Sequence, residues 1–573
     1  MKRKRKEPYS PYSPVFPNIE DWPIFKLSQD RRKFVQDISA FTFQKLVKRH
    51  GSRIADLITK TIYLERIRMK EEPWKVDPPK ERQFWKKTQK RLIKRSLDKS
   101  EAEADQVNQE LLGRIISRYS EEIVGTFKKK TFLFARRFLY VFFTRLLNTA
   151  AGRNLKRIYS RKHRLSDRLI VTGEVEAIRG LMKKGTVVVV PTHFSNLDSI
   201  LIGYALDEYV GLPSFSYGAG LNLYNTGYTA YFMNRLGAYR VDRRKKNPIY
   251  LETLKAMSSL SIQRGVNSLF FPGGTRSRSG ELETRVKLGL LGTVVEAQRV
   301  ILEKGEDEKV FVVPLVLGYH FVLEAQFLIE QHLRKIGKEH YIRAKDKFNS
   351  IRSIFKFIWQ LFSTGNSITI AVGKPMDVMG NLVDDEGNSY DQYGNQIQLK
   401  DYFVSNGQLR ADLQREAEYT KFLGEKIVER FHKDNIVLSS HLVAYAAFLW
   451  LRQENTHLDL YGILRLPPEE YVFDPIVLKY LLRQLIELLT EMEEKEEINL
   501  SDIIKGNLDD LLRDGVKRLG SFHVQKPLRQ NKKGQIVSDS FKILYFYHNR
   551  MASYKLDKSI VWKKVEAAAV VEI

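Results

Sequence analysis

The chain has 573 residues, more than one hydrophobic core usually organises, so we expect a central domain with additional parts. It contains no cysteine, which excludes disulfides, thiolate metal sites, cysteine nucleophiles and acyl-cysteine intermediates. The formal net charge is +27, and 42 lysines and arginines stand against 19 aspartates and glutamates before Val171. This basic front third attracts nucleic acid, anionic lipid or an acidic carrier protein, and composition does not choose among them.

The first segment, residues 1–22, starts with basic residues and repeats the motif Tyr-Ser-Pro, which predicts a disordered basic arm. Prolines and tyrosines follow the charges where a secretory signal has an apolar stretch, so no signal peptide is predicted. Segment 23–150 is helical in pattern and strongly basic. It is expected to form a basic helical region and is a candidate for membrane docking.

One stretch of this region, Thr131 to Leu147, is apolar but carries three arginines, so it falls short of the about 20 apolar residues that span a bilayer. Phe134, Phe138, Phe142 and Leu146 recur every fourth residue, which places them on one face of a helix. Two interpretations remain open: a helix lying in the membrane interface, or a core helix whose arginines extend to solvent.

After Leu169 the pattern changes to short runs rich in β-branched residues, TVVVVP, SLFFPG, KVFVVPLVLGY and SITIAVGKP, separated by segments of helix length. Continuous apolar runs of this kind are typical of buried strands in a sheet covered on both faces. Segment 151–435 is therefore predicted to be an α/β domain.

A polar insertion interrupts this domain near residues 380–402, where Gly387-Asn388 and Gly394-Asn395, seven residues apart, predict a hairpin. Asp384, Asp385 and Glu386 lack the spacing of a calcium loop, so no metal site is predicted. Beyond it, segment 436–573 returns to helical periodicity and is expected to form a carboxy-terminal helical domain.

The run TVVVVP leads directly into a histidine and, five residues later, an aspartate. A strand ending at His193 places the imidazole at the carboxyl edge of the sheet, where α/β proteins build their sites. Asp198, in the first helical turn, can reach one imidazole nitrogen and strengthen the other as a base. No Cys and no G-x-S-x-G elbow accompany the pair, so direct deprotonation of a substrate hydroxyl is favoured over a protein nucleophile.

A second block begins about 80 residues later, Phe271 to Gly280, with the sequence FPGGTRSRSG. Glycines let the backbone approach a ligand, while arginine, serine and threonine side chains supply donors for phosphate oxygens. Two further blocks, GAYRVDRR from Gly237 and VPLVLGY from Val313, lie between and after these. There is no Walker-type phosphate loop.

The order H-x4-D, G-x-[FY]-x-x-x-R, F-P-x-G-T-R-S-R-x-G and V-P-[LV] resembles the four blocks of the glycerolipid acyltransferases, which act on glycerol 3-phosphate, dihydroxyacetone phosphate or lysophosphatidate. Two stretches, PLVLGYHFVLEA and IVLSSHLVAYAAFL, are most similar to the glycerol-3-phosphate and dihydroxyacetone-phosphate branch. The resemblance covers roughly Leu169 to Leu451. It implies an α/β fold with a central mixed sheet flanked by helices.

The resemblance implies roles for single residues. His193 is the expected general base and Asp198 its orienting partner. The residues expected to bind substrate, mainly the acceptor phosphate, are Arg243, Gly274, Thr275, Arg276, Ser277, Arg278 and Pro314. The resemblance further implies acyl-CoA or acyl carrier protein as donor, a glycerol phosphate acceptor and no cofactor.

Three positions depart from the family pattern. Arg240 stands where an aromatic residue is usual, and His320 where a glutamate is usual, although Tyr319 and Glu324 match. Gly273 replaces a glutamate that helps to position the acceptor. Glu281 or Glu283 is a candidate substitute for that carboxylate.

The sequence thus predicts transfer of a fatty acyl chain to glycerol 3-phosphate, at the cytoplasmic face of a membrane with an anionic surface. The alternatives are a lysophosphatidate or dihydroxyacetone-phosphate acyltransferase, a non-catalytic member of the family, or a basic nucleic-acid-binding protein. No helix-turn-helix, zinc or aromatic RNA-binding motif supports the last, so no nucleic-acid partner is expected.

Overall fold

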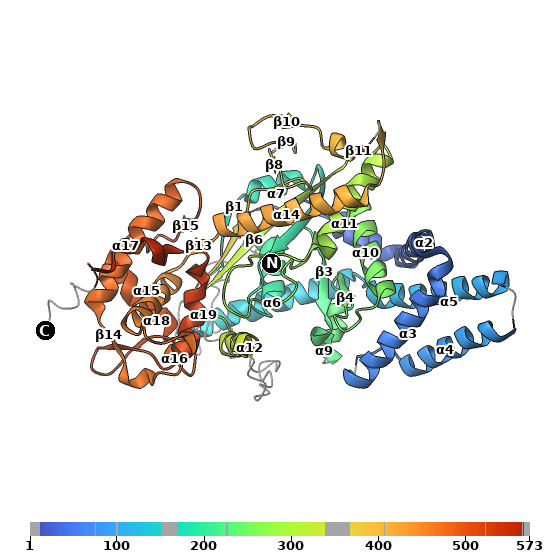
Figure 1. Cartoon of the computed structure of the whole chain (residues 1–573). Helices are drawn as coiled ribbons and strands as arrows, with labels where there is room; N and C mark the ends of the chain where they lie inside the picture. Colours follow the sequence, from blue (N-terminus) through green and yellow to red (C-terminus); the bar gives the residue numbers. More distant parts are fainter. Residues whose placement is uncertain are drawn as a thin grey trace, which may run out of the picture.

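The structure of the protein is a computed structural model that describes residues 12–74, 76–98, 101–150, 169–224, 227–337, 367–405, 407–521, 523–563 and 565 (Figure 1). A seven-stranded sheet forms its centre, in the order β1-β7-β6-β2-β5-β3-β4. The strands are β1 (Leu169–Gly173), β2 (Gly185–Pro191), β3 (Ser216–Gly220), β4 (Ala238–Val241), β5 (Ser268–Leu269), β6 (Lys309–Tyr319) and β7 (Ile368–Val372).

The sheet is mixed, because β6 and β7 pair antiparallel while the other neighbours are parallel. The valines of β2 from Val187 to Val190 are buried, as expected for a β-branched run in a sheet covered on both faces. The predicted α/β class with a mixed central sheet is confirmed. Parallel pairing of β2, β5, β3 and β4 brings their carboxyl ends to one edge, and His193 follows β2 at that edge.

Helices flank the sheet. Those between and after the strands are α7 (Val175–Leu181), α8 (Asp198–Tyr204), α9 (Gly227–Met233), α10 (Pro248–Gln263), α11 (Leu288–Glu303), α12 (Ala325–Gly337) and α14 (Leu413–Lys433). The start of α10 is fixed by Asn247, whose side chain accepts a hydrogen bond from Tyr250 N, and by Pro248 in the first turn. In Figure 1, α14 crosses one side of the sheet, and the helices of residues 31–123 lie beyond β4.

The amino-terminal region consists of α1 (Pro23–Gln29), α2 (Arg31–His50), α3 (Ile54–Glu71), α4 (Glu81–Asp98), α5 (Glu101–Ile123) and α6 (Lys129–Ala150). Helices α2 to α5 share a second hydrophobic core with α10, in which Trp85, Tyr119 and Tyr250 are fully buried. Among the helices within the described ranges, none has the length and apolar content needed to cross a bilayer.

Of segment 1–22, the structure describes residues 12–22, and residues 1–11 lie outside the described ranges. Ile19 and Trp22 are buried, and the Trp22 ring packs edge-on against Phe132. Val15 N donates to Gly211 O at 2.8 Å, which ties the segment to the α/β domain. Two apolar side chains with partners far along the chain outweigh the disorder-promoting composition.

The polar insertion forms a three-stranded antiparallel meander of β8 (Leu382–Val383), β9 (Ser389–Tyr390) and β10 (Gln396–Ile397). Gly387 and Gly394 take positive φ in its two turns, the backbone conformation that glycine adopts most easily. A second hairpin follows, β11 (Val404–Ser405) and β12 (Gln408–Leu409). In the part of the chain that the structure describes, no group of three or more His, Asp and Glu side chains could hold a metal ion.

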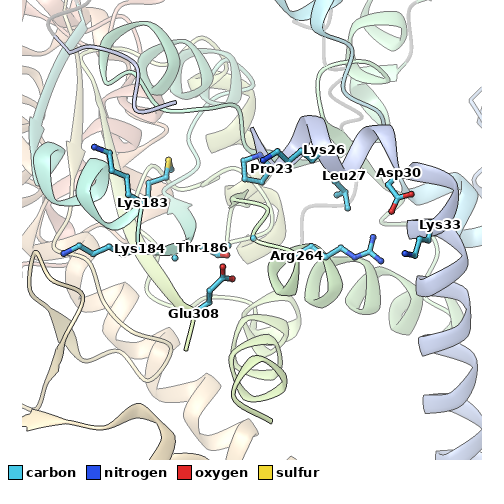
Figure 2. Close-up of a pocket in the computed structure, with 13 residues that line it drawn as sticks. Pro23, Lys26, Leu27, Asp30, Lys33, Lys183, Lys184, Thr186, Arg264 and Glu308 are labelled. Atoms are coloured by element: carbon cyan, nitrogen blue, oxygen red, sulfur yellow. The ribbon is translucent and has the colours of Figure 1, made fainter. Parts of the chain in front are cut away.

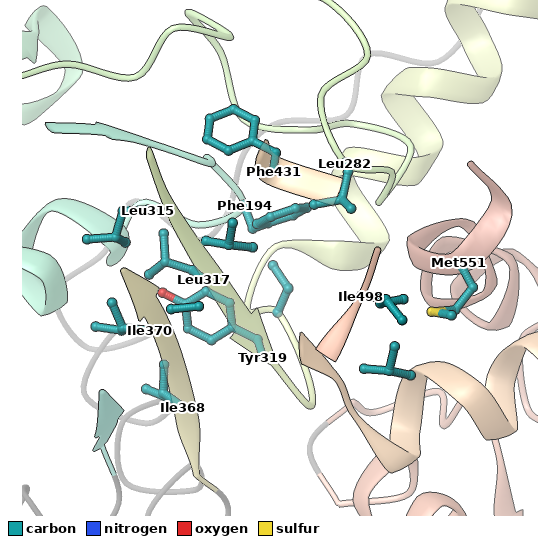
Figure 3. Packing of buried hydrophobic residues seen from close by; sticks show 14 of the residues in the cluster. Phe194, Leu282, Leu315, Leu317, Tyr319, Ile368, Ile370, Phe431, Ile498 and Met551 are labelled. Carbon is teal, nitrogen blue, oxygen red and sulfur yellow. The ribbon is translucent and has the colours of Figure 1, made fainter. Parts of the chain in front are cut away.

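The carboxy-terminal helices are α15 (Ser439–Glu454), α16 (Leu460–Ile463), α17 (Pro475–Glu494), α18 (Leu508–Leu519) and α19 (Phe541–Ala552). Short strands accompany them: β13 (Ile436–Val437), β14 (Val472–Phe473), β15 (Asn499–Leu500), β16 (Arg529–Gln530) and β17 (Ile536–Val537). Every residue of α15 from Ser439 to Leu451 is buried. Figure 3 shows side chains of β6 and β7 together with Met551 of α19 in one apolar cluster, so these helices share the core of the sheet.

Candidate active site

His193 and Asp198 lie in the loop that joins β2 to α8. His193 Nδ1 is 2.8 Å from Asp198 Oδ2, so the predicted contact is present. The same oxygen accepts hydrogen bonds from the backbone N–H groups of Phe194 (2.7 Å) and Ser195 (2.9 Å). Because an ionised carboxylate can only accept, Nδ1 carries the proton and Nε2 is the basic nitrogen. The imidazole stacks on the Phe271 ring with centroids 4.0 Å apart, and its side chain is 14% exposed.

A tyrosine closes the other side of the carboxylate. The hydroxyl of Tyr319 at the end of β6 donates to Asp198 Oδ1 at 2.7 Å. Burial, reinforced by the charge of Asp198, raises the pKa of Tyr319 well above its usual value, so the hydroxyl remains a donor. Asp198 is fully buried with four donors around it, which fixes its orientation toward His193.

Carboxy-terminal helices support this arrangement from behind. His441 of α15 approaches the backbone oxygen of Tyr319 through Nε2 at 2.9 Å, and burial lowers the pKa of His441 to about 3. Arg550 of α19 donates to Leu317 O at 2.7 Å, and its guanidinium lies 4.2 Å from the Phe194 ring centroid. Residues more than a hundred positions beyond the fourth block, which ends at Tyr319, therefore hold β6 and the His193 loop in place.

A buried glutamate joins the histidine loop to the arginine block. Glu324 accepts hydrogen bonds from Ser195 Oγ and Asn196 N, both at 3.0 Å, and pairs with Arg276 Nη1 at 3.0 Å. Ser277 N donates to His193 O at 2.8 Å, which gives a second link. Arg276 and Ser277 are thereby held beside the His193 loop.

Arg243 lies near Arg276, although it comes from a different block. Its neighbours are anchored: Arg244 pairs with Asp242 and Asp77, and Lys245 with Glu122. Arg243 is exposed and has no hydrogen-bond partner among the described residues. Partial desolvation and the positive charge of Arg276 lower the pKa of Arg243. Two guanidinium groups this close to each other, one without a carboxylate partner, make a site suited to an anion.

The other predicted binding residues are more scattered. Thr275 and Arg278 are exposed. Burial, together with the charges of Lys335 and Arg278, lowers the pKa of His332 of α12, so Arg278 lies near this helix. Pro314 is inside β6, paired with Val190 of β2. Ser277 Oγ donates to Glu281 O, so this hydroxyl stabilises the loop.

Lys287 was missed by the sequence interpretation. A Cβ atom at Gly274, which has φ +73°, would lie 2.8 Å from Lys287 Nζ, so this ammonium group lies directly over the block. Tyr319 and Glu324 were noted as matching the family without a role. Only their tertiary contacts reveal what they do.

The hollow in Figure 2 is a different feature. It has a volume of about 580 Å³, and its charged lining residues are Lys26, Asp30, Lys33, Lys183, Lys184, Arg264 and Glu308. Gly185 and Thr186, which also line it, begin β2, whereas His193 follows the end of that strand. The hollow therefore lies at the opposite edge of the sheet from the candidate active site.

Residues 169–318, which include the His-Asp loop and all strands of the sheet except β7, with β6 as far as Gly318, match the family model described as Acyltransferase. The predicted resemblance to glycerolipid acyltransferases of the glycerol-3-phosphate branch is confirmed by curated relatives, which are named glycerol-3-phosphate acyltransferase.

The protein from Pseudoalteromonas translucida is 28% identical over 293 residues, 50% of this chain and 30% of the relative. The protein from Pseudomonas fluorescens is 27% identical over 278 residues, 48% of this chain and 30% of the relative. The protein from Aeromonas hydrophila is 32% identical over 151 residues, 26% of this chain and 18% of the relative. The chain thus aligns with less than a third of the length of these relatives.

Proposed function

We propose that the protein transfers a fatty acyl chain from a thioester to the hydroxyl of glycerol 3-phosphate. The observation that carries the proposal is the position of Arg276 beside the loop of the His193–Asp198 pair, with Arg243 within range of the Arg276 charge. The histidine–aspartate pair can act as the base that deprotonates a hydroxyl, and the two arginines can bind a phosphate on the same small molecule. A hydroxyl and a phosphate on one acceptor are the two groups that such a site recognises.

In the proposed reaction His193 Nε2 removes the proton of the acceptor hydroxyl as its oxygen attacks the thioester carbonyl carbon. The resulting tetrahedral intermediate collapses, the carbon–sulfur bond breaks, and the imidazolium returns its proton to the thiolate. Asp198 remains ionised and stabilises the imidazolium while it exists. The products are an ester and a free thiol, so no cofactor is required.

The proposal is tested by an acceptor panel with one acyl donor. Glycerol 3-phosphate, dihydroxyacetone phosphate and lysophosphatidate all carry a phosphate, and acyl-CoA and acyl carrier protein are both acidic donors. Thiol release from acyl-CoA should require an acceptor and be fastest with glycerol 3-phosphate. A preference for another acceptor would show that glycerol 3-phosphate is not the substrate. If no acceptor received an acyl group from either donor, the proposed function would be contradicted.

Replacing Arg243 by glutamine should raise the KM for glycerol 3-phosphate by about 10- to 100-fold, the value of a charge-assisted hydrogen bond. The KM for acyl-CoA should be unchanged, because the phosphate and the thioester bind separately. Arg243 is the sharper variant, since replacing Arg276 also removes the partner of buried Glu324. Exposed Arg513 of α18 provides a control, and Arg513→Gln should leave both constants unaltered. An effect of Arg243→Gln confined to the acyl-CoA KM would assign this arginine to the donor.

We also propose that α6 and α9 dock the protein on an anionic membrane surface. Phe134 and Phe138 of α6 are 60% and 49% exposed, and Tyr231 of α9 is 49% exposed. Phe134 stacks on both Phe138 and Phe232, which joins the two helices into one aromatic patch. Exposed Lys130 and Arg137 belong to the same helix as the phenylalanines, the combination found in interfacial helices. The side chains of Phe142 and Leu146, expected on the same face, lie outside the description.

The double change Phe134→Ser and Phe138→Ser should weaken binding to vesicles containing phosphatidylglycerol by about ten-fold or more, because two aromatic side chains leave the interface. Vesicle co-sedimentation measures this partition. Phe422→Ser on α14 is the matched control, since Phe422 is 52% exposed but lies on another helix. Equal partition of the double variant and the wild type would place the docking surface elsewhere.

A further inference from the structure

The side chain of Glu283 packs directly against Gly273. Its backbone is outside the left-handed region, so its conformation does not demand glycine. A Cβ atom at this position would lie 3.1 Å from Glu283 Cγ and 3.2 Å from Glu283 Oε1, tighter than most Cβ contacts, so the Glu283 side chain would have to shift. The carboxyl group of Glu283 thus lies where a side chain at residue 273 would begin.

Glu283 also makes the contact that links this carboxyl group to the catalytic loop. Oε1 accepts a hydrogen bond from His193 N at 2.9 Å. Oε2 is buried without a hydrogen-bond partner among the described residues. Pro272 O accepts from Lys287 N at 2.7 Å, which holds the segment containing Glu283 against the Gly273 turn.

Glu281, the other candidate for the missing carboxylate, is placed differently. Ser277 Oγ bonds to its backbone oxygen, and its side-chain charge acts on Tyr545 of α19, where burial together with this charge raises the pKa of the phenol. No hydrogen bond between Glu281 and His193 is present in the described residues. The two carboxylates therefore separate into one beside the catalytic histidine and one facing α19.

We propose that Glu283 is a positioning residue of the active site and replaces in space the carboxylate that the third block lacks at Gly273. It acts through the backbone of His193, which it holds at the end of β2. A carboxyl group contributed ten positions later along the chain thus lies beside Gly273 and acts on the backbone of His193. This inference rests on the acyl transfer proposed above, but part of its test does not require activity.

The protonation state of Glu283 suggests the most informative variants. Burial raises the pKa of Glu283 to about 7, so near neutrality a substantial fraction of the carboxyl groups is uncharged. Glutamine resembles this uncharged form and can still accept from His193 N. Alanine removes the acceptor and leaves the His193 backbone group unpaired.

The first experiment compares kcat of four variants with that of the wild type. Glu283→Ala should lower kcat by about 100-fold, the usual loss when a catalytic group moves by about 1 Å. Glu283→Gln should stay within a few-fold of the wild type. The swap Gly273→Glu with Glu283→Gly should recover most of the lost kcat, and Glu281→Ala should match the wild type. Wild-type kcat in Glu283→Ala, or a folded swap variant as slow as Glu283→Ala, would overturn the proposal.

The second experiment measures thermal unfolding and does not depend on activity. Gly273→Glu alone should lower the Tm, because two carboxyl side chains compete for one space, and adding Glu283→Gly should restore it. Additive changes in Tm would show that the two positions do not share this space and would overturn the inference. If the Tm values couple but the wild type transfers no acyl group, the proposed function fails while the spatial replacement stands.

Discussion

Replacing His193 by alanine should reduce kcat by about 10²- to 10⁴-fold, the contribution of a general base. The fold should persist, because Asp198 keeps three donors after the change: the backbone N–H groups of Phe194 and Ser195 and the hydroxyl of Tyr319. The KM for glycerol 3-phosphate should change little, since phosphate binding is assigned to the arginines. Thiol release from acyl-CoA, measured at several acceptor concentrations, gives both kcat and the KM for glycerol 3-phosphate.

His457 offers a control for the histidine change. It is exposed in the carboxy-terminal region, so His457→Ala should retain wild-type kcat. Circular dichroism should show the same unfolding temperature for both variants within a few degrees. If His193→Ala kept more than about a tenth of the wild-type kcat, the loss would be smaller than the removal of a general base causes, and the proposed mechanism would be wrong.

Changing Gly280 to alanine should lower the free energy of unfolding by about 3 kcal/mol, from backbone strain and overlap together. Gly280 has φ +91°, and an added Cβ atom would lie 2.1 Å from the backbone oxygen of Phe546 in α19. The same contact region includes the hydrogen bond from Asn549 Nδ2 to Ser279 O at 2.9 Å. Urea unfolding followed by tryptophan fluorescence measures the change.

Gly305 separates the two causes of this loss. It has φ +76°, but no atom lies within 4 Å of an added Cβ. Gly305→Ala should therefore cost only the strain, about 1 kcal/mol. If both variants lose equal stability, close packing of α19 on the third block makes no measurable contribution. A larger loss for Gly280→Ala, with reduced kcat, would show that α19 holds the block in place.

Local features of the site were predictable because they depend on nearby residues. The valine run of β2 defines a buried strand, and five residues suffice for Asp198 to fold back onto His193. The order of the four blocks predicted the family and the mixed sheet. In each case the signal lies within a short stretch of sequence or in a pattern typical of a known fold.

Contacts between distant residues were not predictable from patterns. Glu324 joins Ser195 to Arg276, and the three positions are linked only by the fold. Nothing in the spacing of Tyr319 indicates that its hydroxyl reaches Asp198. The composition of residues 12–22 predicted disorder. It could not reveal the packing of Trp22, because the aromatic residues that Trp22 contacts lie about a hundred positions later in the chain.

The hydrogen bond from Arg550 to Leu317 joins residues 233 positions apart. Closing so long a loop is slow relative to forming the local β2–α8 turn, so docking of α19 is expected late in folding. During synthesis the His193 loop leaves the ribosome long before the helix that supports it. A nascent chain would therefore hold the His193–Asp198 pair without the backing of α19, and acquisition of the proposed activity would report a late stage of folding.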